Sequence, residues 1–136
     1  MTNTELLWFI FTDELVAALL FPINDKYVLE SALLLRDNLS HNLAYLCAFL
    51  GNFSGAIINY FFALMISNGL NLKFVIDKKI TNMMFASLIL LPINFFGSLA
   101  SFLSGIIKLP FKLYAVISLL VLLLYYGILI LSLIHI

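Results

Sequence analysis

The chain has 136 residues, of which 64% are hydrophobic and only 10% are charged. Soluble domains contain roughly half apolar and a quarter charged residues, and a chain of this length could not bury such an apolar excess, so the composition predicts an integral membrane protein. Seven basic residues balance seven acidic ones, which argues against nucleic acid as a partner.

Four apolar regions follow one another along the chain, at residues 6–35, 43–67, 83–107 and 113–136. The second and the fourth carry no Asp, Glu, Lys or Arg and are about 25 residues long. A helix of that length measures roughly 37 Å, which is enough to cross a hydrocarbon core of about 30 Å. Because lipid offers the backbone no hydrogen bonds, both regions are predicted to be transmembrane α-helices.

Proline interrupts the first and third regions in the same way. Leu-x-Pro-Ile-Asn stands at residues 20–24 and again at residues 90–94. Each region is either one kinked spanning helix or two half-helices that turn at the proline and leave by the side they entered. We favour the second, re-entrant arrangement, because it places five lysines on one side of the membrane: Lys73, Lys78, Lys79, Lys108 and Lys112. By the positive-inside rule that side is cytoplasmic, and both termini lie outside.

The predicted fold is therefore an all-α integral membrane protein with a single membrane domain. Two inverted repeats, residues 1–67 and 80–136, each consist of a re-entrant helical hairpin followed by a transmembrane helix, and residues 68–79 link them. Broken helices from two inverted repeats meet near the midplane of many secondary transporters. The stretch 72–80 mixes apolar residues with lysines, which fits either an amphipathic surface helix or a solvated loop.

Acidic residues in the first region are candidates for chemistry. Asp13 and Glu14 have apolar neighbours on both sides. A carboxylate inside a membrane is functional by default, unless the pair lies at the interface, where charge costs little. Asp25 and Lys26 follow the first proline, either in a water-accessible vestibule at the hairpin turn or in an ordinary solvated turn with an ion pair to Glu30.

An asparagine follows Pro-Ile in both regions. Asn24 and Asn94 are predicted to cap the half-helices that come after the breaks, and such helix N-termini also attract anions. With Ser98 they are expected to line the place where the two hairpins meet. The whole candidate transport pathway comprises Asp13, Glu14, Asn24, Asp25, Lys26, Asn94 and Ser98.

Small residues at helical spacing predict close helix packing in two places. Gly51 and Gly55 lie one turn apart in the second region, and Gly97 and Gly105 flank a serine-rich stripe in the third. The neighbour of the Gly51 helix is either the second hairpin or another subunit. Near it, two asparagines are placed to hydrogen-bond across helices or to line a polar path: Asn52 and Asn59.

Nothing in the sequence indicates a metal, a cofactor or an enzyme. Cys47 stands alone in an apolar run and is predicted to be a small buried hydrophobe. His41 and His135 lie at a loop and at the end of the chain, whereas haem ligation requires histidines on facing helices. A phosphate-binding loop and a Ser-His-Asp arrangement are missing as well.

Three stretches carry a family resemblance: ALLFPINDKYVLESALLL (18–35), CAFLGNFSGAIINYFFA (47–63) and GSLASFLSGIIKLPF (97–111). They resemble the first hairpin, the following helix and the second hairpin of the DedA family of bacterial inner-membrane proteins, also called SNARE-associated or VTT-domain proteins. The small YqaA-like branch is the most similar. In the third stretch Gly97, Gly105 and Lys108 have the spacing of a family Gly, Gly and Arg. The resemblance that these stretches carry extends over most of residues 15–126.

The chain departs from this family where the family carries charge. Where the family has an acidic residue after the first proline, this chain has Lys26, with Asp25 beside it. Where the family has an Asp after the glycine of the second hairpin, this chain has Ser98. A late Lys and Arg fall near Leu122 and Tyr125, and Pro92 is two residues out of register. Proton coupling by the family route is therefore in question for this chain.

The resemblance implies a role in membrane homeostasis, by transport or flipping of a lipid or amphiphilic anion such as undecaprenyl phosphate, in the bacterial inner membrane. The alternative is a non-transporting scaffold that has lost the functional charges, and a holin-like pore is a third hypothesis. Membrane lipids are the expected partners. A homodimer fits this chain, because two repeats this short offer little surface to seal a transport pathway on their own.

Overall fold

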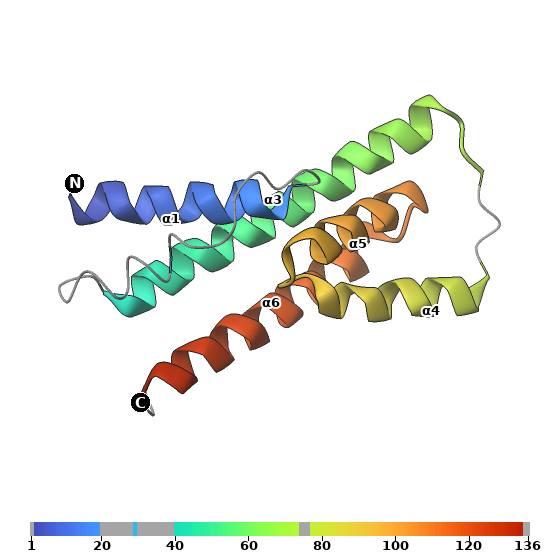
Figure 1. The fold of residues 1–136 in the computed structure, drawn as a ribbon. Helices are drawn as coiled ribbons and strands as arrows, with labels where there is room; N and C mark the ends of the chain where they lie inside the picture. The colour runs from blue at the N-terminus through green and yellow to red at the C-terminus, as the bar shows by residue number, and fades with distance from the viewer. Residues whose placement is uncertain (1, 20–28, 30–39, 74–76, 135–136) are drawn as a thin grey trace.

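The computed structural model describes residues 2–19, 29, 40–73 and 77–134, and these residues form helices joined by turns (Figure 1). The elements are α1 (Asn3–Ala18), α3 (His41–Gly69), α4 (Lys78–Ser87), the 3₁₀ turn η1 (Leu88–Leu90), α5 (Asn94–Ile106) and α6 (Phe111–Ile134). Among the described residues, two helices, α3 and α6, are long and apolar enough to cross a membrane. For the part of the chain that the structure describes, the predicted all-α architecture with two such helices is confirmed.

Helix α1 begins with a capping box. The Thr2 hydroxyl accepts a hydrogen bond from the Glu5 N–H, and the Glu5 carboxylate accepts one from the Thr2 N–H at 2.7 Å. This exchange satisfies two backbone donors that a helix N-terminus leaves open. The helix ends at Ala18, because Leu19 is extended with a ψ of 161°.

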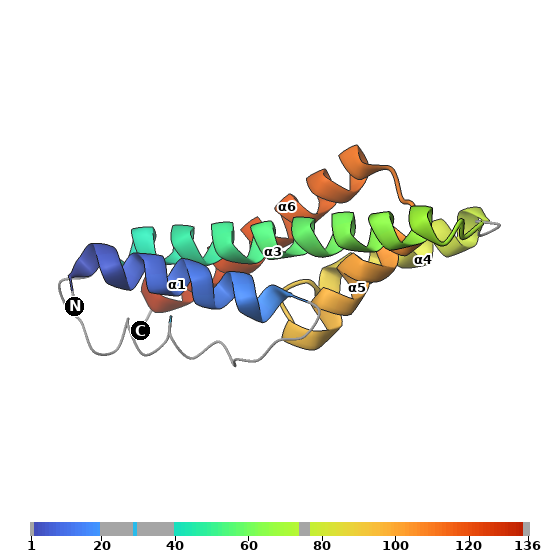
Figure 2. The same cartoon turned by 90° about the horizontal axis from the view of Figure 1, so that it is seen from above.

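Three helices, α1, α5 and α6, are arranged along α3. α1 runs beside α3 in the same direction, so both helices start at one end of the molecule (Figures 1 and 2). α5 contacts α3 farther along, past the end of α1, and α6 runs antiparallel to α3. α3 is therefore the helix that the other three share.

The chain reverses at the second proline, as Figure 1 shows between α4 and α5. α4 and η1 lead to the break, Ile93 is extended with a ψ of 109°, and α5 returns alongside α4. The N-cap of α5 is thus Ile93, and Asn94 is the first helical residue rather than the predicted cap. Because α3 runs to Gly69 and α4 starts at Lys78, helix also replaces the first two and the last two residues of the predicted linker 68–79.

Lysines gather at one end of this arrangement, where α3 and α5 end and α4 and α6 begin (Figure 1). They are the five that were expected to share one side: Lys73, Lys78, Lys79, Lys108 and Lys112. At the other end, where α1 and α3 begin, the structure describes the acidic Glu5 and no lysine or arginine. The two ends of the described bundle therefore differ in charge.

Each of the three prolines removes a backbone donor. Proline has no N–H, so the carbonyl four residues earlier loses its helical partner. The affected carbonyls belong to Ala18, Leu88 and Ile106, which precede Pro22, Pro92 and Pro110. The Leu88 carbonyl is satisfied locally, because η1 tightens the turn and the Leu91 N–H donates to it at 3.0 Å. The other two carbonyls receive side chains from elsewhere in the fold.

Candidate functional site

Glu14 lies in the centre of the bundle with 2% of its surface exposed. The Tyr126 hydroxyl, from α6, donates a hydrogen bond to its Oε2 at 3.0 Å. The Asn52 amide, from α3, approaches the same oxygen and the Tyr126 hydroxyl, each at 3.4 Å. One carboxyl group therefore joins side chains from α1, α3 and α6, which is how a buried acid avoids the cost of desolvation.

Glycines on α3 allow α1 to come close enough for this contact. A Cβ atom added at Gly51 would collide with the carbonyl oxygen of Phe11 and lie 3.1 Å from the Cβ of Glu14. One added at Gly55 would lie 2.7 Å from both the Ala18 Cβ and the Leu15 oxygen. The neighbour of the Gly51 helix is therefore α1 of the same chain, which is neither of the two partners that were expected.

The end of α1 is held by donors from two other helices. The Asn59 amide of α3 donates to the Ala18 carbonyl at 2.7 Å, and the Ser98 hydroxyl of α5 donates to it at 2.8 Å. Because α1 ends at Ala18, this carbonyl has no helical donor. Ser98, predicted to line a pathway, thus hydrogen-bonds to the backbone where α1, α3 and α5 meet.

Ser67 does the same for the end of α5. Its hydroxyl donates to the carbonyl of Ile106 at 2.7 Å, and because Ile106 is the last residue of α5 this carbonyl has no helical donor. Next to it Lys108 has a φ of 56°, and the Leu109 N–H donates to the Ser104 carbonyl, so the last turn of α5 closes with a left-handed residue. Polar residues of α3 therefore complete both broken helices.

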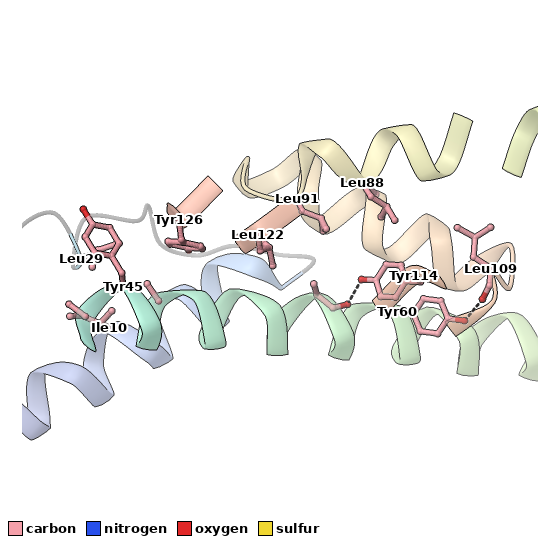
Figure 3. Close-up of a cluster of buried hydrophobic side chains, with 14 of the residues drawn as sticks. Ile10, Leu29, Tyr45, Tyr60, Leu88, Leu91, Leu109, Tyr114, Leu122 and Tyr126 are labelled. Carbon is pink, nitrogen blue, oxygen red and sulfur yellow. Dashed lines mark hydrogen bonds between the residues drawn. The ribbon is translucent and has the colours of Figure 1, made fainter. Parts of the chain in front are cut away.

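Two tyrosines fix α6 against α3 (Figure 3). The Tyr60 and Tyr114 rings stack with their centroids 4.5 Å apart. The Tyr114 hydroxyl donates to the Ala56 carbonyl at 2.9 Å, and the Tyr60 hydroxyl donates to the Leu109 carbonyl in the α5–α6 corner. These contacts set the register that brings Tyr126, three turns farther along α6, to Glu14.

The structure brings only some of the predicted site residues together. Asp13, 6% exposed, and Glu14 are in the core, and Ser98 is at the end of α1. Asn24, Asp25 and Lys26 lie outside the described residues. Gly105 packs on the Tyr60 carbonyl and on Ala63, whereas Gly97 faces Leu91 at the tip of its own hairpin.

Sequence reasoning missed the tyrosines. Tyr114 and Tyr126 stand in a Leu- and Ile-rich helix, where their hydroxyls were the available signal for a polar contact. Within the part of the chain that the structure describes, no three His, Cys, Asp or Glu residues are grouped so that they could hold a metal ion. The acidic centre is therefore a hydrogen-bonded carboxyl group between helices.

The comparisons leave the family open. No family model, no curated protein and no solved structure matches this chain.

Proposed function

We propose that this chain is a DedA-like membrane protein that moves a lipid or amphiphilic anion across the bilayer, driven by proton uptake at Glu14. The observation that carries the proposal is the burial of Glu14 between α1, α3 and α6, where Tyr126 donates a hydrogen bond to it. An ionisable group inside a membrane bundle usually marks a proton or substrate path.

The chemistry of the site suits a proton switch. Ionised Glu14 only accepts hydrogen bonds, whereas protonated Glu14 carries a donor and is a weaker, neutral acceptor for Tyr126 and Asn52. Protonation or deprotonation of Glu14 therefore changes how strongly α1 is bound between α3 and α6. Movement of α1 is transmitted to α5, because Ser98 of α5 is bonded to the last carbonyl of α1.

In this proposal α3 and α6 cross a bacterial inner membrane, and α4, η1 and α5 enter and leave it from the cytoplasmic side. Many large apolar side chains face outward, such as Met65 and Leu124, as expected of helices that contact lipid. The lysine-bearing end is cytoplasmic under the positive-inside rule.

Two features support an amphiphilic anion as the substrate. An apolar recess of about 320 Å³ opens between α1 and α3, with a lining that suits a hydrocarbon chain: Thr4, Leu7, Trp8, Phe11, Cys47 and Leu50. The five lysines at the other end of the bundle attract anionic headgroups to the cytoplasmic surface.

Reconstituted vesicles test this function. The purified protein should speed the translocation of a fluorescent anionic lipid, followed with a quencher added outside, and a pH gradient should change the rate. Glu14→Gln should remove the response to the gradient, because the amide cannot exchange a proton. Glu5→Gln is the matched control, since Glu5 is an exposed glutamate on the same helix, and its response should match that of the wild type. An unchanged response in Glu14→Gln would rule out the proton-coupled function.

A second candidate function is that of a non-transporting scaffold. It is favoured by the use of Ser67, Ser98 and Asn59 to satisfy backbone carbonyls, a purely structural role. Vesicles that translocate no lipid at any pH, from a protein that still folds and binds membranes, would support the scaffold against the transporter.

A further inference from the structure

The apolar recess between α1 and α3 is lined by one face of each helix. The residues of α1 recur at helical spacing over about 10 Å, at Thr4, Leu7, Trp8 and Phe11. α3 adds Cys47 and Leu50, which are one turn apart. None of these six side chains is charged, and Thr4 at the start of α1 has the one hydroxyl among them. The lining therefore suits an apolar ligand whose polar end stays near Thr4.

The recess lies on the side of the α1–α3 pair that faces away from α6. Phe49 stands between Cys47 and Leu50 in the sequence, but on a helix it belongs to another face. Its ring centroid lies 6.3 Å from that of Tyr126 on α6. At the mouth of the recess Trp8 is 64% exposed and Leu50 is 43% exposed. In a bilayer such outward apolar side chains meet lipid, so hydrocarbon is the material available to fill the recess.

The level of the recess in the bundle assigns it to one leaflet. α1 and α3 both start at the end away from the lysines (Figure 1), and Cys47 and Leu50 are among the first ten of the 29 residues of α3. Ten residues of helix rise about 15 Å, which is half of a hydrocarbon core of about 30 Å. The recess therefore opens to lipid in the leaflet away from the lysine-bearing end.

The inner end of the recess is next to Glu14. Leu50 directly precedes Gly51, where the backbone of α3 packs on the Phe11 carbonyl of α1. Phe11 is in turn three residues from Glu14, or about 5 Å along α1. A ligand that fills the recess would thus lie within one helical turn of the carboxyl group that is proposed to take up protons.

We propose that this recess binds one acyl chain of a lipid from the leaflet away from the lysines, with the chain lying along α1 toward Glu14. Its volume of about 320 Å³ is within the range of small-ligand sites, which are mostly apolar. Left empty, the recess would forfeit dispersion contacts that a hydrocarbon chain restores. The inference rests on the proposed function only in making this lipid the substrate, since binding of a chain requires no transport.

Fluorescence quenching tests the proposal, because Trp8 is the one tryptophan of the chain. The protein is kept in CHAPS, a detergent without an alkyl chain, and titrated with phosphatidylglycerol that has brominated acyl chains. A bound chain should quench Trp8 with saturation. Cys47→Phe, which fills the recess, should raise the half-saturating lipid concentration at least about fivefold. Leu46→Phe is the matched control at an exposed position of the same helix, and it should shift that concentration less than about twofold.

Two further arms separate the recess from general lipid contact and the chain from the headgroup. In Trp8→Phe with Leu124→Trp the fluorophore is on an exposed position of α6, and quenching there should rise in proportion to added lipid without saturating. Phosphatidylcholine with the same brominated chains should bind to the recess as phosphatidylglycerol does, because the lining is uncharged. Glycerol phosphate, which has no chain, should not compete.

Saturable quenching of Trp8 that Cys47→Phe weakens and Leu46→Phe does not supports the proposal. Quenching that does not saturate, that equals the Leu124→Trp response, or that glycerol phosphate abolishes overturns it. If Cys47→Phe fails to fold, the wild type decides, because Cys47 is the one cysteine of the chain. Saturating lipid should slow its reaction with N-ethylmaleimide at least about fivefold by covering the thiol, and an unchanged rate overturns the proposal. Since neither assay measures translocation, failure here is distinct from failure of the proposed function.

Discussion

Gly51→Ala is expected to destabilise the protein by about 3 kcal/mol, because the added methyl group would meet the Phe11 carbonyl of α1. Backbone cannot rotate away as a side chain can, so α1 must separate from α3 and the Glu14 contacts must lengthen. The measurement is thermal or denaturant unfolding in detergent, followed by circular dichroism.

Gly127→Ala is the matched control for this prediction. Gly127 is also inside a long helix, but an added Cβ would have no neighbour within 4 Å. The same substitution should therefore be neutral or stabilise by up to about 1 kcal/mol, since alanine favours helix. Equal stability of the two variants would show that α1 does not pack on Gly51.

Ser67→Ala is expected to cost about 2 kcal/mol, and Ser98→Ala less than about 1 kcal/mol. Both serines are buried, both donate to a helix-ending carbonyl, and both lose the same hydroxyl. The difference lies in the acceptor, because the Ala18 carbonyl keeps Asn59 when Ser98 is lost, whereas Ser67 is the described side chain that serves Ile106.

The double variant Asn59→Ala with Ser98→Ala sharpens this test. It should cost more than the sum of the two single changes, because the Ala18 carbonyl becomes unpaired only when both donors are gone. Unfolding free energies of the single and double variants measure the coupling. Strict additivity, or a Ser98→Ala variant as unstable as Ser67→Ala, would contradict the shared-acceptor arrangement.

The long helices and the second break followed from the sequence alone. Charge-free runs of about 25 residues gave α3 and α6, and the loss of a backbone donor at Pro92 gave the reversal before α5. The common position of the five lysines followed from that reversal. These features depend on local composition and on the chemistry of proline, which a single sequence contains.

The hydrogen bonds between helices around Glu14 could not be predicted from the sequence in the same way. In the apolar α6, Tyr114, Ser118 and Tyr126 recur at helical spacing and mark one face, but a hydroxyl does not by itself indicate which helix or which group it contacts. The acidic pair was recognised, but its partner lies 112 positions away along the chain, on another helix. Asn59 was expected to hydrogen-bond across helices or to line a polar path. Its acceptor is the backbone carbonyl of Ala18, and because every residue has such a carbonyl, the sequence does not identify it.

The central claim is that Glu14 gains and loses a proton within the bilayer. Infrared difference spectroscopy on the protein in lipid, recorded across a pH titration, measures this directly through the carbonyl stretch of protonated carboxylic acids. The wild-type spectrum should contain a component of this band that Glu14→Gln loses and Glu5→Gln retains, because the other acidic residues contribute the rest of the band. Identical difference spectra for the wild type and Glu14→Gln would contradict the claim.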